Sequence, residues 1–345
     1  MAEKVGPAAT RKIRLMEVCG THTMVIARMG LKKLLPPSVE LVSGPGCPVC
    51  VTPEHEIDRA LAVAEKPGVI MATFGDMMRV PGSRKSLADI KASGGDVRVV
   101  YSCLDALEIA SENPGREVVF MGVGFETTAP TVAATVLEAR RKRTGNFFIL
   151  CNFKTVFPAL SHIGSSKKLR VDGFICPGHV SVITGSRPYE AFASLYKKAC
   201  VITGFGDADV LKGVKRLIEK VKESDFKVET EYGRAVTRQG NKTARQIMNR
   251  VFRTADARWR GLGTIPESGL ALKKEFARFD AGRRFRVRVP AGKTVKGCLC
   301  GEVLQGYKSP GDCRLFGRAC VPSRPVGPCM VSSEGTCAAY YKYGV

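Results

Sequence analysis

The sequence predicts an α/β protein with two similar α/β domains of mainly parallel sheet and a third, smaller domain rich in cysteine. Short apolar runs with β-branched residues recur along the first 225 residues. Stretches with a helical spacing of apolar residues separate these runs. Continuous apolar runs of this length are typical of strands buried on both faces, as in parallel sheets covered by helices. The pattern ends near residue 225, and Gly, Pro and Cys are frequent beyond it.

Eight apolar runs are predicted strands, and they form two sets of four along the chain. The first set is IRLMEV (13–18), VELVSG (39–44), GVIMATFG (68–75) and DVRVVYS (96–102). The second set is EVVFMGVG (117–124), NFFILCN (146–152), VDGFICPG (171–178) and ACVITGFG (199–206). Helices are expected between the strands, and this alternation predicts parallel sheets.

Three of the intervening segments carry clear helical signals. PTVAATVLEARRKR (130–143) and RPYEAFASLYKKA (187–199) each have a proline in the expected first turn, where its fixed backbone suits a helix. The third segment, 207–224, has apolar residues at helical spacing: Val210, Val214, Leu217 and Val221.

We expect the two α/β domains at 11–112 and 113–225, with the boundary near SENPGRE (111–117). Loops with glycine or cysteine follow the strands in both domains, among them CGTHT, GPGCPVC, FGDMMRVPG, GVGFETTAP, CPGHVS and GFGDAD. Functional sites of open α/β sheets lie at the carboxyl ends of the strands. The expected site is therefore a cleft between the two domains.

The last segment, 226–345, is predicted to be a third, small unit. It contains a polar stretch, one expected helix at TARQIMNRVF (243–252) and a loop-rich part with Gly, Pro and Cys. Because so few apolar residues could hardly order this segment, we expect bound metal to staple it.

Composition and charge narrow the choice of function. No run approaches the roughly 18 apolar residues that cross a bilayer, and no signal-peptide core is apparent, so we expect a soluble, cytoplasmic protein without a membrane partner. The formal net charge is +22. The basic residues lie on predicted helical faces without interleaved aromatic residues, which argues against a nucleic-acid partner. An acidic protein partner fits the same charge.

The thirteen cysteines indicate metal or thiol chemistry more than a disulfide framework, because their number is odd and no secretory signal is seen. Six of them fall within the last 48 residues: Cys298, Cys300, Cys313, Cys320, Cys329 and Cys337. Four others, Cys103, Cys151, Cys176 and Cys200, stand alone beside mostly apolar residues and are expected to be buried hydrophobic residues.

The C-terminal cysteines favour an iron–sulfur cluster. Gaps of 12, 6 and 16 residues separate one set of four, Cys300, Cys313, Cys320 and Cys337. Zinc sites usually use tight CxxC pairs, and none occurs here. Wide spacing with Gly and Pro suits four thiolates around a cluster better, with zinc second and disulfides third. Cys298 and Cys329 are possible substitutes.

Cys47 and Cys50 form a CxxC motif in GPGCPVC, directly after a predicted strand. This spacing is typical of dithiol/disulfide redox pairs. The glycines and prolines predict a sharp turn, which would leave both thiols at a strand end and not inside a helix. Redox or thiol transfer is therefore favoured over a structural zinc half-site, since no second tight pair accompanies it.

Cys19 and His22 lie three residues apart in MEVCGTHTM, after the first predicted strand. The thiol could be a nucleophile with His22 as its base. It could equally be a soft metal ligand that His22 supports. A buried cysteine near a capping threonine is the structural alternative. The residues alone leave these three interpretations open.

Taken together, these motifs resemble the HypD family of hydrogenase maturation proteins. The similarity runs in order from about residue 13 to 343 through MEVCGTHT, SGPGCPVCVTP, TFGDMMRVPG, VVYSCLDAL, GVGFETTAP, PGHVS, WRGLG, CGEVLQG and CMVSSEGTCAAYYKY. The resemblance implies a scaffold on which the Fe(CN)2CO unit of nickel–iron hydrogenase is assembled. It also implies two partners, the small chaperone HypC and the cyanide donor HypE.

The resemblance also assigns roles to residues of this chain. It implies that Cys19 holds the iron of the transient Fe(CN)2CO unit, with His22 in the same loop, and that Cys47 and Cys50 form a redox-active pair. It further implies that a 4Fe–4S cluster is held by four ligands, Cys300, Cys313, Cys320 and Cys337. Met24 stands where some family members have a second histidine, which argues against any role that requires two imidazoles.

The implied chemistry suits these residues. Cyanide and CO need electron-rich, low-spin iron, for which a thiolate is a suitable anchor. Transfer of cyanide from a thiocyanate-type donor is formally reductive, and a dithiol beside a cluster could supply the electrons. The alternatives are a stand-alone, cluster-linked thiol–disulfide oxidoreductase and a purely structural metal-binding adaptor. Whether the chain is itself an enzyme stays open.

Overall fold

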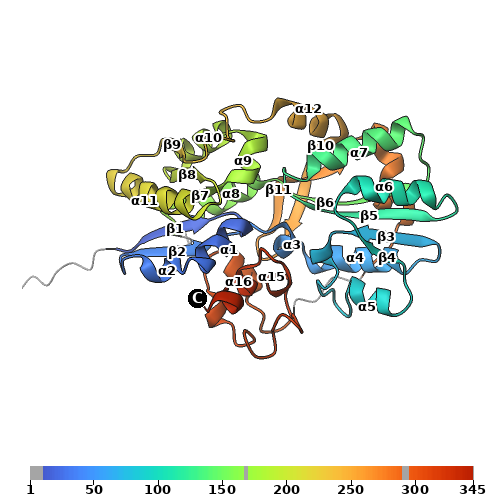
Figure 1. The fold of residues 1–345 in the computed structure, drawn as a ribbon, viewed down its shortest axis with the longest axis horizontal. Helices are drawn as coiled ribbons and strands as arrows, with labels where there is room; N and C mark the ends of the chain where they lie inside the picture. The colour runs from blue at the N-terminus through green and yellow to red at the C-terminus, as the bar shows by residue number, and fades with distance from the viewer. Residues whose placement is uncertain (1–10, 167–169, 290–294, 345) are drawn as a thin grey trace, which may run out of the picture.

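Two parallel sheets, at opposite sides of the view in Figure 1, organise the chain in the computed structural model, which describes residues 11–166, 170–289 and 295–344. The first sheet has the order β2-β1-β7-β8-β9 and the second the order β4-β3-β5-β6. The first contains β1 (Ile13–Glu17), β2 (Val39–Ser43), β7 (Gly173–Pro177), β8 (Ala199–Thr203) and β9 (Val228–Thr230). The second contains β3 (Val69–Thr73), β4 (Val97–Val99), β5 (Glu117–Gly124) and β6 (Phe147–Phe153).

All eight predicted strands form, which confirms the α/β class, but their predicted grouping is wrong. Strands β3 and β4 pair within the sheet of β5 and β6, across the expected boundary at 112/113. Strands β1 and β2 belong with β7 and β8 instead, because β1 pairs with β7 from Leu15↔Gly173 to Glu17↔Ile175. The chain therefore leaves the first sheet after β2 and returns to it at β7, so the ranges 11–112 and 113–225 do not correspond to the two sheets.

Helices cover the sheets and connect their strands. Those up to the return into the first sheet are α1 (Gly20–Arg28), α2 (Leu31–Leu34), α3 (Pro48–Val51), α4 (Glu54–Ala64), α5 (Leu87–Ala92), α6 (Cys103–Glu112), α7 (Ala129–Arg141) and α8 (Val156–Gly164). The later ones are α9 (Gly178–Thr184), α10 (Arg187–Tyr196), α11 (Asp207–Glu223), α12 (Lys242–Val251), α13 (Ala281–Phe285), α14 (Cys300–Leu304), α15 (Pro328–Val331) and α16 (Thr336–Tyr343). Short 3-10 helices lie at Gly75–Met77, Lys274–Phe279 and Pro310–Asp312.

The three helices with clear sequence signals are confirmed as α7, α10 and α11. In α11, the predicted apolar face is buried at Val210, Val214 and Leu217. The largest hydrophobic cluster joins both sheets, since it contains Met16 and Phe174 of the first as well as Met71 and Val119 of the second. A shared core of this kind fixes the strand ends of the two sheets relative to each other.

The segment 226–345 is not one separate unit. Strand β9 extends the first sheet, and α12 packs on α7. The antiparallel hairpin of β10 (Phe252–Trp259) and β11 (Gly263–Leu272) packs against β6 and α8. The cysteine-rich part begins only after this hairpin, and its helices α14 to α16 contact α1 and α3 near the centre of the molecule (Figure 1).

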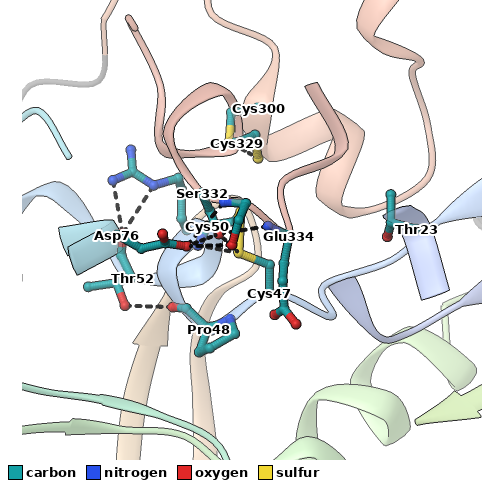
Figure 2. Close-up of a disulfide and its surroundings, with 12 residues drawn as sticks. Thr23, Cys47, Pro48, Cys50, Thr52, Asp76, Cys300, Cys329, Ser332 and Glu334 are labelled. Carbon is teal, nitrogen blue, oxygen red and sulfur yellow. Dashed lines mark hydrogen bonds between the residues drawn. A yellow bond between two sulfur atoms is a disulfide. The ribbon is translucent and has the colours of Figure 1, made fainter. Parts of the chain in front are cut away.

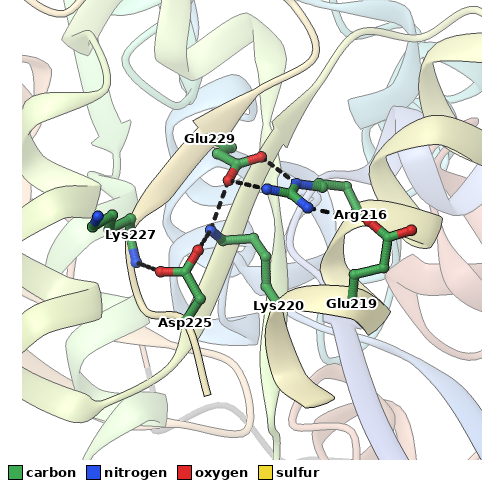
Figure 3. Close-up of polar contacts among 6 residues, drawn as sticks. All are labelled: Arg216, Glu219, Lys220, Asp225, Lys227 and Glu229. Carbon is green, nitrogen blue, oxygen red and sulfur yellow. Dashed lines mark hydrogen bonds and ion pairs between the residues drawn. The ribbon is translucent and has the colours of Figure 1, made fainter. Parts of the chain in front are cut away.

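A buried lysine pairs with two carboxylates at β9, the edge strand of the first sheet (Figure 3). The side chain of Lys220 in α11 is fully buried, and its Nζ lies 2.5 Å from Asp225 and 2.9 Å from Glu229. Arg216 donates two further hydrogen bonds to the carboxylate of Glu229. Two carboxylates thus balance the buried ammonium group, which holds β9 against α11.

None of the helices in the described ranges combines the length and the hydrophobicity that a bilayer crossing requires.

Candidate functional site

Cys19 lies where β1 passes into α1. The strand ends at Glu17, and Cys19 is the first residue before the helix, with extended backbone. The loop that contains Cys47 packs directly on this turn, because the backbone N–H of Gly20 donates to the carbonyl of Gly46 at 3.0 Å. Gly46 faces the Cys19 backbone so closely that a side chain would not fit. The Cys19 turn and the loop of the CxxC motif are thereby held side by side.

The Cys19 thiol is buried and neutral in the absence of a metal. Its exposed fraction is 7%. Burial raises its pKa to about 12, and the nearby carboxylate of Glu334 acts in the same direction. The backbone N–H groups of His22 and Thr21 favour the thiolate and oppose this shift. A thiol in this environment becomes a thiolate when a metal ion binds it.

A buried carboxyl group lies beneath the same turn. Burial raises the pKa of Glu17 to about 7. The hydroxyl of Thr23 donates to Glu17 Oε1 at 2.6 Å, and the backbone N–H of Cys19 donates to Oε2 at 3.3 Å. These bonds fix the turn between β1 and α1. No local sequence signal distinguishes Glu17 from an ordinary strand residue.

The ring of His22 is directed toward the first sheet. Its Nε2 lies 2.9 Å from the carbonyl oxygen of Gly204 and 2.8 Å from the hydroxyl of Thr203, at the end of β8. The ring stacks on Phe205, whose other neighbour in the stack is His179. Burial lowers the pKa of His22 to about 4. Among the described residues His22 Nδ1 has no hydrogen-bond partner, so no hydrogen bond joins the ring to Cys19.

Cys47 and Cys50 form a disulfide (Figure 2). Cys47 precedes the short helix α3, which contains Cys50, so the expectation that both thiols lie outside a helix holds only for Cys47. The backbone N–H of Cys50 points to Cys47 Sγ at 3.1 Å. Both residues are buried, with exposed fractions of 3% and 0%.

The segment before α16 lies beside the disulfide (Figure 2), and its Glu334 contacts the Cys19 turn. Ser332 Oγ lies 3.4 Å from Cys47 Sγ. Its hydroxyl donates to Asp76 Oδ2 at 3.0 Å, at the end of β3. Two residues further on, Glu334 accepts a hydrogen bond of 2.6 Å from the hydroxyl of Thr21. One short segment therefore connects residues from the ends of both sheets, and sequence reasoning did not single out any of these polar side chains.

The six C-terminal cysteines surround one small cavity of about 20 Å³. The lining contains all four residues predicted as cluster ligands and also Cys298 and Cys329. Cys300 Sγ lies 2.8 Å from Cys329 Sγ, and the thiol of Cys329 lowers the pKa of Cys300 by donating to it. Within the described ranges no three His, Cys, Asp or Glu side chains converge on a point that a single metal ion would occupy. Thiolates distributed around a cavity are the donor set of an iron–sulfur cluster, so the residues fit this group chemically.

Arg260 of the WRGLG motif lies between the C-terminal cysteines and the residues that directly follow α3. Its guanidinium group donates to the carbonyl oxygen of Thr52 at 2.9 Å and forms an ion pair with Glu54. A larger cavity of about 390 Å³ lies beside it and is lined by Arg260, Cys298 and Cys300. The helices that contain Cys300 and Cys329, α14 and α15, both contact α3, and Figure 2 shows the two thiols in the same region as the disulfide.

Fold and site together define a thiol-rich α/β protein, in which a buried cysteine, a disulfide and a cysteine-lined cavity meet at the ends of two parallel sheets. A family model named HypD, described as "Hydrogenase formation hypA family", matches residues 1–344. The chain therefore belongs to the HypD family.

Curated relatives agree with this assignment over about nine tenths of their length. The chain is 46% identical to the hydrogenase maturation factor HypD of Cupriavidus necator over 342 residues, which cover 97% of this chain and 90% of that protein. It is 45% identical to HypD of Rhizobium leguminosarum bv. viciae, with 97% and 89% covered. It is 43% identical to HypD of Rhodobacter capsulatus, with 100% and 93% covered.

Proposed function

We propose that the chain is a maturation factor for nickel–iron hydrogenase and serves as the scaffold on which the Fe(CN)2CO unit is assembled. Family membership supports the general role. The observation that carries the specific role is the contact between the Cys19 turn and the CxxC loop, where Gly20 N–H donates to Gly46 O at 3.0 Å. It holds a potential iron ligand beside a redox-capable pair.

In this proposal Cys19 anchors the iron, which is cargo and not a resident cofactor. The burial that raises the pKa of Cys19 to about 12 also keeps water away from the bound iron. A free thiol of this kind is inert, so the site would acquire its thiolate only on loading. His22 would orient the turn through its backbone N–H, since its ring is engaged by Gly204 and Thr203.

The disulfide supplies a site for reducing equivalents in this scheme. Opening the Cys47–Cys50 bond stores two electrons as a dithiol next to the iron anchor. We propose that a 4Fe–4S cluster is held by Cys300, Cys313, Cys320 and Cys337, where it would supply one-electron chemistry beside this pair. The cysteine-lined cavity supports this choice, although Cys298 and Cys329 share the same lining.

The partners are a HypC-type chaperone and a HypE-type cyanide donor, and the proposed location is the cytoplasm. The formal net charge of +22 suits partners with acidic surfaces. The chain would be isolated anaerobically with its HypC-type partner and examined by infrared spectroscopy. Bands of iron-bound CO and cyanide support the scaffold role. A disulfide that cycles without any such bands would favour a stand-alone thiol–disulfide oxidoreductase.

A further inference from the structure

Ser332 lies between a sulfur atom and a carboxylate. Its Oγ is 3.4 Å from Cys47 Sγ and 3.0 Å from Asp76 Oδ2. The backbone N–H of Glu334 donates to Ser332 Oγ at 3.2 Å, which fixes the position of the hydroxyl group. Ser332 is 1% exposed, so water does not compete for these contacts. Figure 2 shows the serine between the disulfide and Asp76.

The two sulfur atoms of the pair have different surroundings. The backbone N–H of Cys50 points to Cys47 Sγ at 3.1 Å, and Ser332 Oγ lies 3.4 Å from this sulfur as an acceptor for a Cys47 S–H, because its own proton is donated to Asp76. Across the part of the chain that the structure describes, Cys50 Sγ has no corresponding donor. Hydrogen-bond donors stabilise a thiolate. Cys47 is therefore the sulfur that the site favours as a thiolate once the bond is open.

Asp76 does not need Ser332 for its own hydrogen bonds. Ser333 donates to Asp76 Oδ2 twice, from its backbone N–H and from its hydroxyl, each at 3.1 Å. These bonds suffice to hold the carboxylate at the end of β3. A purely structural role would make the Ser332 hydroxyl redundant beside that of Ser333, yet only Ser332 also reaches the sulfur.

We propose that Ser332 is a positioning residue that relays the proton of reduced Cys47 to Asp76 and thereby makes Cys47 the reactive thiolate of the pair. This inference rests on the proposed redox function of the CxxC motif. The Cys47 S–H gives its proton to Ser332 Oγ while the Ser332 O–H gives its own to Asp76 Oδ2. The products are a Cys47 thiolate, an unchanged serine and a protonated Asp76, which is partly exposed and passes the proton to water.

The same arrangement serves reduction of the disulfide by a dithiol. One thiolate of the reductant attacks Cys50 Sγ, the S–S bond breaks, and the electron pair stays on Cys47 Sγ, where the backbone N–H of Cys50 stabilises it. The second thiolate of the reductant then displaces Cys50, which takes up a proton. The reductant leaves as its own disulfide, so two electrons have moved to the protein.

The test measures thiolate formation directly. The full chain is reduced with dithiothreitol, and the rate of carboxamidomethylation of Cys47 is followed against pH by mass spectrometry. Ser332→Ala should slow the reaction about 100-fold at neutral pH and move the profile to higher pH, because the Cys47 proton then has to leave to hydroxide and no longer passes through Ser332 to Asp76. Asp76→Asn should also slow the reaction at neutral pH, because an amide does not take up the proton that Ser332 passes on. Ser332→Thr, which keeps a hydroxyl, should restore the wild-type profile.

Ser333→Ala is the matched control, because it removes a hydroxyl from the same carboxylate oxygen without touching the sulfur. It should retain the wild-type profile. A Ser332→Ala profile that superimposes on wild type, with the pair opening normally, overturns this inference alone. A wild-type pair that stays closed under reducing conditions overturns the proposed redox function and this inference with it.

Discussion

Replacing Gly46 with alanine should separate the Cys19 turn from the CxxC loop. An added Cβ would lie 2.2 Å from the backbone nitrogen of Cys19 and 2.5 Å from the carbonyl carbon of Val18, whereas ordinary contact begins at 3.4 Å. Because both obstacles are backbone atoms, no side chain can rotate away, and the loop must move by about 1 Å. Overpacking of this kind costs about 1–3 kcal/mol of unfolding free energy.

The displacement should also impair function more than stability. A shift of about 1 Å at a reacting group reduces rates by about 100-fold, so maturation should fall by about that factor. Urea unfolding followed by circular dichroism measures the first effect, and hydrogenase activity of cells carrying the variant measures the second. Gly115→Ala is the control, since nothing lies within 4 Å of its added Cβ. Wild-type stability and activity of Gly46→Ala would refute the proposed close packing.

Three further predictions concern the pH response, the buried lysine and the cluster ligands. Burial raises the pKa of Glu126 to about 7, so the folded protein holds this proton more tightly and loses stability as pH rises from about 4.5 to about 7. Glu126→Gln should therefore add about 2–3 kcal/mol to the unfolding free energy at pH 8 and little at pH 5. An equal gain at both pH values would contradict this prediction. Lys220→Met should lower the unfolding free energy by about 2 kcal/mol, because it leaves the carboxylates of β9 and its neighbouring turn without their buried partner; unchanged urea unfolding would exclude that role. Cys313→Ala should abolish the visible absorption and iron content of the anaerobically isolated protein, whereas Cys298→Ala should retain both, and the reverse pattern would show that the ligand choice is wrong.

Local patterns predicted the elements of the fold but not their pairing. The apolar runs specify strands because burial on both faces leaves a clear sequence pattern, and all eight are present. Pairing of β1 with β7 joins residues about 160 positions apart, as in Leu15↔Gly173. Nothing in the periodicity of a single run records such a partner. The expectation of two consecutive domains therefore failed although every strand was correct.

The candidate site shows the same division. Cys47 and Cys50 were predictable because CxxC is a local motif, and their disulfide is present. Asp76 and Ser332 come from distant segments, and their roles depend on contacts across 256 residues. The resemblance selected four cluster ligands, but the cavity contains six cysteines, and geometry alone does not separate them.

Infrared spectroscopy of the Cys19→Ser variant tests the central claim most directly. The variant and the wild-type chain would each be isolated anaerobically with the HypC-type partner. A hydroxyl is a far poorer ligand for low-spin iron than a thiolate, so we expect the bands of iron-bound CO and cyanide in wild type and their loss in the variant, with fold and cluster absorption unchanged. Bands of full intensity in Cys19→Ser would show that the iron is anchored elsewhere and would contradict the proposed scaffold site.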